Sequence, residues 1–265
     1  MRISGRERGR YDCQLVLPEL GERGQAALRA GRVLVVGAGG LGAPVLLYLV
    51  AAGVGHVTVV DDDVVELSNL QRQVLYTTDD LGQPKAERAA ARLRAMNPEV
   101  TVTAVTERFR AATAEALVAA HDVVVTAVDD FPTRYLLNDA CVLARRTLVD
   151  GAVLRTSGLA MTVKGGETAC YRCLFPEPPP PAGVVSCAEA GILGPVPGVI
   201  GAVQALEAIK VLAGVGQPLY GRLLQFDGAA MTFTEVAVAR DPGCPVCGRR
   251  PTITALRDLD DGGAC

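Results

Sequence analysis

The chain has 265 residues, of which 49% are hydrophobic and 21% charged, and its formal net charge is −3. This composition is typical of a soluble α/β protein, and the charge gives no basic footprint for nucleic-acid binding. The first ten residues (MRISGRERGR) are charged and lack the apolar stretch of a signal peptide. We therefore expect a cytoplasmic protein with reduced cysteines, and neither nucleic acid nor membrane as a partner.

Strands and helices alternate along the first 155 residues. The pattern predicts a helical arm at 14–30, strands at 32–36, 56–63, 100–105, 122–128 and 147–152, a glycine turn running into a helix at 37–53, and helices at 83–97, 112–120 and 133–146. This order implies parallel strands with right-handed crossovers, which is a doubly wound, Rossmann-like α/β sheet. Residues 33–55 carry no charge and could suggest a membrane span, but six glycines and a proline favour a strand, a turn and a buried helix.

The character of the sequence changes after residue 155. We expect a strand at 157–163, a proline-rich loop at 175–183, a long apolar helix within 191–214 and a hairpin at 221–238. The chain is accordingly divided into an arm (1–30), a nucleotide-binding half (31–155), a second half of the same domain (156–250) and a tail (251–265).

A glycine pattern indicates a nucleotide site. Gly37, Gly39 and Gly42 satisfy G-x-G-x-x-G between a strand and a helix, where glycines allow a tight turn and let backbone N–H groups approach a phosphate. Asp61 ends the next strand, where a carboxylate can bind ribose hydroxyls. The pattern does not distinguish NAD from ATP, and glycines that only close a turn would produce it too.

Three polar residues favour ATP. Asn69 and Arg72 lie in SNLQRQ (68–73), and Lys85 closes QPK (83–85). Cleavage between the α- and β-phosphates develops charge on pyrophosphate and needs nearby cations, whereas hydride transfer has little use for them. Ordinary solvated charges remain the alternative for Arg72 and Lys85.

Two carboxylates follow the strand predicted at 122–128. Asp129 and Asp130 would stand at the carboxyl edge of the sheet, where ligands bind in open α/β folds. A carboxylate there suits Mg²⁺ shared with phosphates, and the alternative is an N-cap for the helix that follows.

Two Cys-x-x-Cys pairs predict a metal centre. Cys170 and Cys173 form the first pair, Cys244 and Cys247 the second, and each has the spacing of half a zinc site. A Cys₄ structural zinc site would join segments that lie 71 residues apart. A redox motif is the alternative, but one would expect a single pair near the first βαβ unit. The two histidines lie beside predicted strands, so we expect them to be structural.

Cys187 stands alone after the proline-rich loop and before a glycine-rich helix start. Exposure and a helix N-terminus would favour the reactive thiolate, and an ordinary loop cysteine is the alternative. Cys13, Cys141 and Cys265 carry no local signal.

Several motifs, taken together and in order, resemble the MoeB/ThiF adenylyltransferases, which are relatives of the ubiquitin-activating enzymes. They are VLVVGAGGLG (33–42), DDDVVELSNLQRQ (61–73), GQPK (82–85), CYRC (170–173), SCAEAGILGPVPGVIGAVQALEAIK (186–210) and PGCPVCG (242–248). The resemblance covers roughly residues 10 to 250.

The resemblance implies a homodimer that uses ATP and Mg²⁺ to adenylylate the C-terminal Gly-Gly carboxylate of a ubiquitin-like sulfur-carrier protein. A sulfurtransferase or a cysteine desulfurase would then supply the sulfur, since we expect no sulfurtransferase domain in this chain. The implied nucleotide-site residues are Gly37, Gly39, Gly40, Gly42, Asp61, Asn69, Arg72, Lys85 and, linked to Mg²⁺, Asp129. The implied zinc ligands are Cys170, Cys173, Cys244 and Cys247, and Cys187 matches a cysteine that some members use covalently.

The sequence departs from the family at one position. The family pattern resembles R-Y-x-R-Q, whose second arginine reaches ATP in the partner subunit, but Cys13 stands in that place here. Either Arg10, Arg8 or Arg6 substitutes for it, or Arg72 and Lys85 neutralise the leaving group alone.

The predicted mechanism is in-line attack of the carrier carboxylate on the α-phosphate of ATP, which needs positioning and charge neutralisation but no side-chain nucleophile. A nicotinamide-dependent oxidoreductase, a non-catalytic scaffold that binds carriers, and a family member acting on a peptide or tRNA remain alternatives. The sequence does not reveal which pathway the carrier serves.

Overall fold

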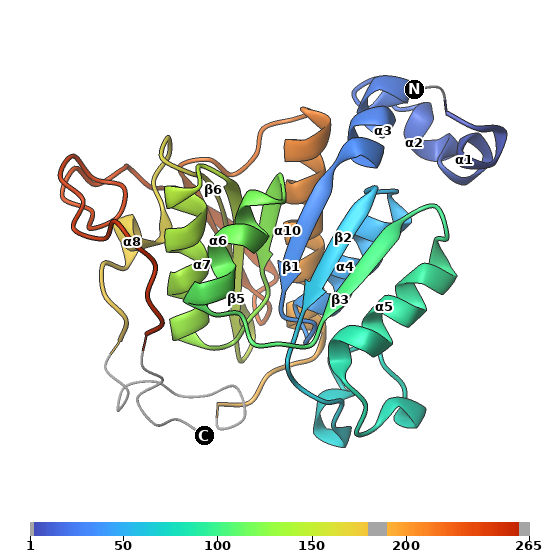
Figure 1. The fold of residues 1–265 in the computed structure, drawn as a ribbon, viewed down its shortest axis with the longest axis horizontal. Coiled ribbons are helices and arrows are strands. Elements are labelled where there is room, and N and C mark those ends of the chain that lie inside the picture. The colour runs from blue at the N-terminus through green and yellow to red at the C-terminus, as the bar shows by residue number, and fades with distance from the viewer. Residues whose placement is uncertain (1–2, 180–189, 260–265) are drawn as a thin grey trace.

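A single mixed sheet organises the molecule. The computed structural model describes residues 3–179 and 190–259. Its sheet has eight strands in the order β3-β2-β1-β4-β5-β6-β7-β8. Figure 1 shows this sheet between two layers of helices, with a helical arm at one corner.

Five parallel strands form the first part of the sheet. They are β1 (Arg32–Val36), β2 (His56–Val60), β3 (Thr101–Val105), β4 (Val123–Thr126) and β5 (Thr147–Leu154). The pairing of β1 with β2, β2 with β3, β1 with β4 and β4 with β5 is parallel throughout. Strands buried on both faces are near-continuous apolar runs, which explains why RVLVV and VVVT were recognisable in the sequence.

Helices cover both faces of this part. One layer contains α4 (Gly42–Ala51), α5 (Lys85–Met96) and α10 (Pro195–Ala213), and the other contains α6 (Ala111–Ala119) and α7 (Phe131–Leu143). Alternate residues of β1 face the two layers, with Val33 and Val35 in one apolar cluster and Leu34 and Val36 in the other. The doubly wound α/β expectation is confirmed.

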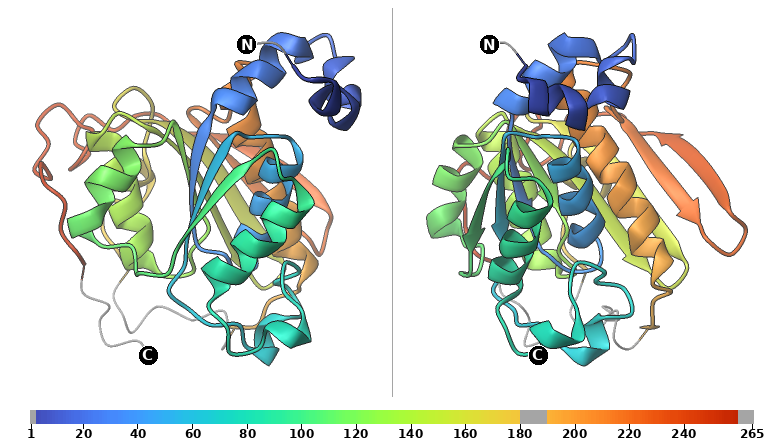
Figure 2. Two further views of the ribbon diagram at one scale, coloured as in Figure 1. Left: turned by 45° about the vertical axis from the view of Figure 1, so that its right-hand side comes forward. Right: turned by 90° about the vertical axis from the view of Figure 1, so that its right-hand side faces the viewer.

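The remaining strands extend the sheet beyond β5, and each pairs antiparallel with its neighbour. They are β6 (Ser157–Lys164), β7 (Arg222–Asp227) and β8 (Thr232–Ala237), and β7 and β8 form the expected hairpin. Figure 2 shows the hairpin projecting from the body, and every residue of β8 is exposed. The sheet runs without a break across residues 155 and 156. The division of the chain into halves stays a prediction.

The N-terminal arm differs in detail from the expected helix at 14–30. It consists of α1 (Gly5–Arg10), α2 (Asp12–Leu15) and α3 (Gly21–Ala30). Ser4 and Glu7 form a capping box that starts α1 earlier than apolar periodicity suggested. The sequence also gave no signal for the one-turn α8 (Tyr171–Leu174) or the 3₁₀ turns η1 (Leu67–Asn69) and η2 (Thr78–Asp80). Such short elements bury too few residues to show a period.

α10 is long and apolar enough to cross a membrane by length and composition, but half of its apolar stretch is buried inside the protein. It packs against α4, α3 and β5. The stretch at 33–55 resolves into β1, a turn and α4, as expected. Burial within the protein core explains the apolar character of both segments.

Candidate functional site

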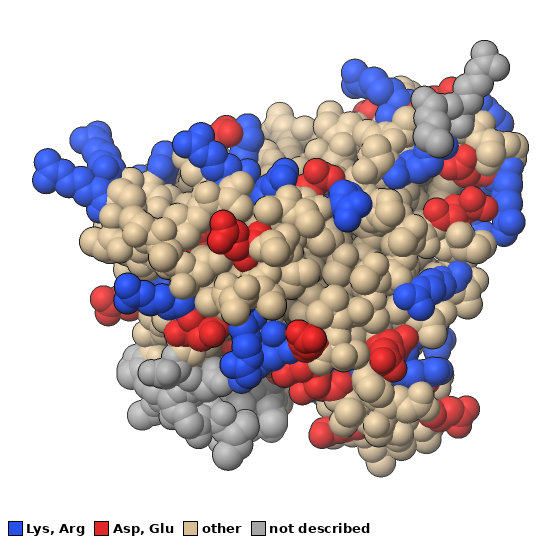
Figure 3. All heavy atoms as spheres, viewed as in Figure 1, with Lys and Arg blue, Asp and Glu red and all other residues tan. Residues whose placement is uncertain are grey.

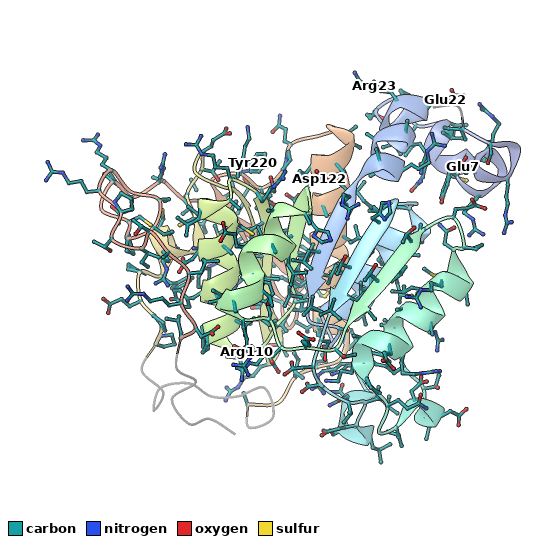
Figure 4. All side chains as sticks on the ribbon, viewed as in Figure 1. Glu7, Glu22, Arg23, Arg110, Asp122 and Tyr220 are labelled. Atoms are coloured by element: carbon teal, nitrogen blue, oxygen red, sulfur yellow. The ribbon has the colours of Figure 1, made fainter. Side chains whose placement is uncertain are left out.

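The carboxyl ends of the parallel strands form the lower edge of the molecule. Figure 4 marks the two edges: Asp122, which precedes β4, lies at the upper one, and Arg110, which follows β3, lies at the lower one. Gly37 and Asp129 follow strands that pair in register, Val36 with Thr126, so both emerge at the lower edge. Figure 3 shows acidic and basic side chains interspersed on the face of the molecule seen in Figure 1, with several acidic ones near the lower edge of that view.

The turn between β1 and α4 requires glycine at two positions. Gly37 has φ +96, and a Cβ there would lie 2.4 Å from the carbonyl oxygen of Ala127. A Cβ on Gly42 would lie 2.1 Å from the carbonyl oxygen of Gly37. Gly39 and Gly40 have more room, since their nearest neighbours would be 3.4 Å and 3.3 Å away. The first N–H groups of α4 therefore open onto a narrow backbone turn, the geometry that suits a phosphate.

Asp61 is attached to this turn. Its carboxylate accepts hydrogen bonds from the backbone N–H of Ala38 at 2.7 Å and of Asp63 at 3.0 Å. Burial raises the pKa of Asp61, while these bonds and the nearby charge of Lys85 oppose the rise. A partly buried carboxylate beside the glycine turn is well placed to accept bonds from ligand hydroxyls.

Lys85 extends a buried stem to the same place. It is the first residue of α5 and 5% exposed, and its Nζ lies 2.8 Å from Oδ2 of Asp63. The side chain of Asp63 is 71% exposed, so the charged end of Lys85 sits at the protein surface. The sequence does not distinguish Asp63, because three consecutive aspartates offer no means of telling their roles apart.

The segment after η1 covers the glycine turn. The Cγ atom of Arg72 would lie 3.4 Å from a Cβ on Gly40, and its Nη1 donates to the carbonyl oxygen of Ser68 at 3.1 Å. Asn69 is buried at the end of η1. Arg72 thus lies beside the turn, three residues after Asn69, and the roles of both in binding phosphate stay predictions.

Two residues of this region escaped the sequence interpretation. Tyr76 donates its hydroxyl proton to the carbonyl oxygen of Ala38 at 2.8 Å, and burial raises its pKa, so it stays a donor. Gln73 is 4% exposed and lies against Gly39, and its Oε1 is one of three buried side-chain atoms without a partner among the described residues. Tyr76 lies outside the quoted motifs, and Gln73 closes SNLQRQ (68–73) without a role assigned to it there, since both act through their folded position.

Asp129 and Asp130 differ in environment. Asp130 is the N-cap of α7 and accepts a hydrogen bond from the backbone N–H of Thr133 at 2.7 Å. Asp129 is exposed at the lower edge. The capping alternative therefore belongs to Asp130, which leaves the Asp129 carboxylate facing solvent.

The four paired cysteines come together. Cys170 is the N-cap of α8 and Cys173 lies within that helix, while Cys244 and Cys247 follow β8. The sulfur atoms of all four lie within 4.8 Å of one another. Three of the Sγ–Sγ distances are 3.4, 3.6 and 3.9 Å. Tetrahedral Zn²⁺ with Zn–S bonds of about 2.3 Å requires sulfur atoms about 3.8 Å apart, so this donor set fits the metal.

The remaining cysteines and His121 lie outside this cluster. Cys141 is buried, and burial raises the pKa of its thiol, while Cys13 is exposed on α2. Cys187 and Cys265 lie outside the described residues. His121 is structural as expected, since its ring contacts Thr58 Oγ1 at 2.8 Å and the carbonyl oxygen of Leu117 at 2.7 Å.

The arginines near Cys13 are engaged within their own chain. Arg6 pairs with Glu99 at 3.1 Å, Arg8 pairs with Glu22, and Arg10 donates to the carbonyl oxygen of Met96 at 3.2 Å. The arm also precedes β1, whereas the glycine turn follows it, and five strand residues span about 17 Å. These arginines therefore do not reach the glycine turn of the same chain.

Comparison with known proteins gives a consistent result. The model of the ThiF family matches residues 11–246. The sulfur carrier protein adenylyltransferase of Thermus thermophilus is 51% identical over 98% of both chains, and the SAMP-activating enzyme E1 of Haloferax volcanii is 50% identical over 97% of this chain and 94% of its own. The mouse adenylyltransferase and sulfurtransferase MOCS3 is 50% identical over 95% of this chain, which spans 55% of that protein.

Solved structures share the fold. Escherichia coli MccB with MccA-N7isoASN superposes with a TM-score of 0.77 at 24% identity, covering 86% of this chain and 71% of that one. PaaA superposes with a TM-score of 0.77 at 21% identity, covering 91% and 76%. At these identities the likeness concerns architecture alone.

Proposed function

The chain belongs to the ThiF family, and we propose that it adenylylates the C-terminal Gly-Gly carboxylate of a ubiquitin-like sulfur-carrier protein. The observation that supports this most strongly is the meeting of the glycine turn, Asp61, Arg72 and Lys85 at one edge of the sheet. A relative that is 51% identical over nearly its whole length carries the name sulfur carrier protein adenylyltransferase. Family membership and this cationic site both argue against a nicotinamide-dependent oxidoreductase.

ATP would bind with its phosphates against the turn and the start of α4. Asp61 would accept hydrogen bonds from the ribose hydroxyls, because its carboxylate is already fixed by Ala38 and Asp63. Asn69, Arg72 and Lys85 would contact the phosphates. Lys85 would exchange its bond with exposed Asp63 for a phosphate oxygen, a small cost because that pair faces water.

The reaction needs no side-chain nucleophile. A carboxylate oxygen of the carrier attacks the α-phosphorus, the bond to the bridging oxygen breaks, and that oxygen leaves with its electron pair on pyrophosphate. Arg72 and Lys85 would stabilise the charge that develops on the leaving group. Asp129 would hold Mg²⁺, which supplies further charge neutralisation when bound, since a solvent-facing carboxylate is a suitable oxygen ligand.

Zn²⁺ would have a structural role. A site closed by four thiolates leaves no open coordination position for chemistry. We propose Cys170, Cys173, Cys244 and Cys247 as the ligands.

The later step and the assembly are also part of the proposal. A sulfurtransferase or cysteine desulfurase would convert the acyl-adenylate into a thiocarboxylate, with or without a covalent intermediate at Cys187. We propose a homodimer in the cytoplasm. How the arginine absent at position 13 is compensated stays a prediction, with Arg6, Arg8 or Arg10, or Arg72 and Lys85 alone, as the alternatives.

Carrier-dependent exchange of pyrophosphate into ATP tests the proposal. The purified chain should catalyse exchange with a ubiquitin-like carrier that ends in Gly-Gly, and a carrier lacking its last glycine is the matched control. Exchange with a short peptide or a tRNA instead would indicate another substrate class within the family. A folded chain without exchange towards any of them would make it a binding scaffold.

A further inference from the structure

α8 is fastened to α7 by the two residues between the first pair of cysteines. The backbone N–H of Tyr171 donates to Oδ1 of Asn138 at 2.9 Å. Arg172 donates from Nε and Nη2 to the two carboxylate oxygens of Asp139, each at 2.7 Å. Such a two-pronged buried pair fixes the guanidinium plane as well as its charge.

Cations and aromatic rings alternate at this junction. The guanidinium of Arg134 lies 4.4 Å from the ring centre of Tyr171, and that of Arg172 lies 4.6 Å from the ring centre of Tyr135. The two rings meet edge to face with their centres 5.0 Å apart, and Arg134 is itself paired with Asp150 on β5. Each ring is therefore held on two sides, which leaves the Tyr135 hydroxyl little freedom.

This junction holds three consecutive backbone carbonyl groups. Tyr135 donates its hydroxyl proton to the carbonyl oxygens of Phe175 at 3.0 Å and Glu177 at 2.7 Å. Nη1 of Arg172 donates to the carbonyl oxygen of Pro176 at 2.9 Å. A stretch rich in proline lacks the N–H groups to build a helix or a ladder, so side-chain donors set its path instead.

The held stretch lies against α7, the helix that begins beside the proposed site. Tyr135 is the fifth residue of α7, about 6 Å along the axis from Phe131, and Phe131 follows Asp129 and Asp130 at the lower edge. Residues 175–177 therefore run beside the first two turns of α7, the helix that begins at the lower edge.

We propose that Tyr135 and Arg172 are positioning residues that hold the backbone at 175–177 as a wall for the C-terminal tail of the carrier. This inference rests on the proposed function. A tail ending in Gly-Gly offers no side chains for recognition, so an extended backbone must be guided by surfaces that are already in place. Holding three successive carbonyl groups before the tail arrives removes that ordering cost from binding.

Tyr135→Phe tests the inference because it removes one oxygen and keeps the ring. In carrier-dependent pyrophosphate exchange we expect the KM for the carrier to rise about tenfold, as loss of pre-ordered binding predicts, with kcat and the KM for ATP within about twofold. Zinc content and melting temperature should match those of the parent. Tyr220→Phe, at the upper edge in Figure 4, is the matched control and should leave all four quantities unchanged.

The possible outcomes distinguish failure of this inference from failure of the proposed function. An unchanged carrier KM in folded Tyr135→Phe overturns the inference, as does a fall of kcat and melting temperature together, which would mean a merely structural role. Arg172→Lys, which keeps the charge but loses the fork, should raise the carrier KM further. A parent chain without exchange overturns the proposed function itself.

Discussion

Gly37 and Gly39 lie two residues apart in one turn but meet different surroundings. Gly37→Ala would combine a positive φ with a Cβ 2.4 Å from a carbonyl oxygen, so we expect a loss of about 1–3 kcal/mol in the free energy of unfolding. Gly39→Ala meets only ordinary contacts and should unfold near the parental denaturant midpoint, yet raise the KM for ATP by crowding the phosphates. Equal stability of the two variants in urea titration would contradict this account of the turn.

Lys85 has a buried aliphatic stem and a charged end at the surface, so a substitution can remove the charge and keep the packing of the stem. Lys85→Met keeps the stem and should melt near the parent, but lose about 10²–10³ in exchange rate, the usual cost of one preorganised charge. Lys164→Met is the control. Lys164 pairs with exposed Glu167 and lies opposite Thr147, the first residue of β5, so it stands at the other end of that strand from the proposed site. If Lys85→Met exchanges pyrophosphate at the parental rate, Lys85 has no role in the reaction.

At the scale of elements, the cysteine cluster joins α8 to the segment after β8. Cys173→Ser should lower bound zinc from about one per chain and lower the melting temperature with it. Structural zinc contributes about 10–16 kcal/mol in small fingers, although a domain with a large core depends on it less. Metal analysis that finds no zinc in the parent, with all four thiols freely titratable, would refute the site.

The arm should loosen in acid. Hydrogen bonds from Ser4 lower the pKa of Glu7, which also pairs with Arg29 at 3.0 Å on α3. A lowered pKa in the folded state means that the stabilisation is full above the ordinary value of 4.5 and is lost as the pH falls below it. Limited proteolysis of the arm should therefore accelerate below about pH 4.

Glu7→Gln should show fast cleavage of the arm already at neutral pH. Glu22→Gln, which removes a more exposed partner of Arg8, is the control and should behave like the parent. Cleavage of the parent that does not change with pH would contradict the role of Glu7.

At the scale of the whole molecule, the two apolar clusters share the strands of one sheet. We expect one calorimetric unfolding transition. ATP with Mg²⁺ should raise its temperature, with a stabilisation of about 2.7 kcal/mol when the ligand concentration is one hundred times Kd. Zinc removal should shift the same transition downwards. Two transitions, only one of them sensitive to ATP, would mean that the parts fold independently.

Sequence periodicity predicted the parallel strands and long helices because each buries a continuous apolar face. It could not predict that Lys85 pairs with Asp63, that Tyr76 holds Ala38, or that Asp130 rather than Asp129 caps α7. Those contacts depend on where strands end relative to one another, to within one residue. The cysteine spacing predicted the partners of the cluster because metal ligation has its own local pattern, independent of the surrounding fold.

The cysteine cluster also carries a consequence for synthesis on the ribosome. Cys244 follows Cys173 by 71 residues, so at translation rates of about 5–20 residues per second roughly 4–14 s separate the two pairs. The glycine turn, Asp61, Arg72, Lys85 and Asp129 all emerge before either pair is complete. Metal binding would therefore be among the last events of maturation. A chain truncated before Cys244 would contain the whole glycine turn but could not complete the four-cysteine site.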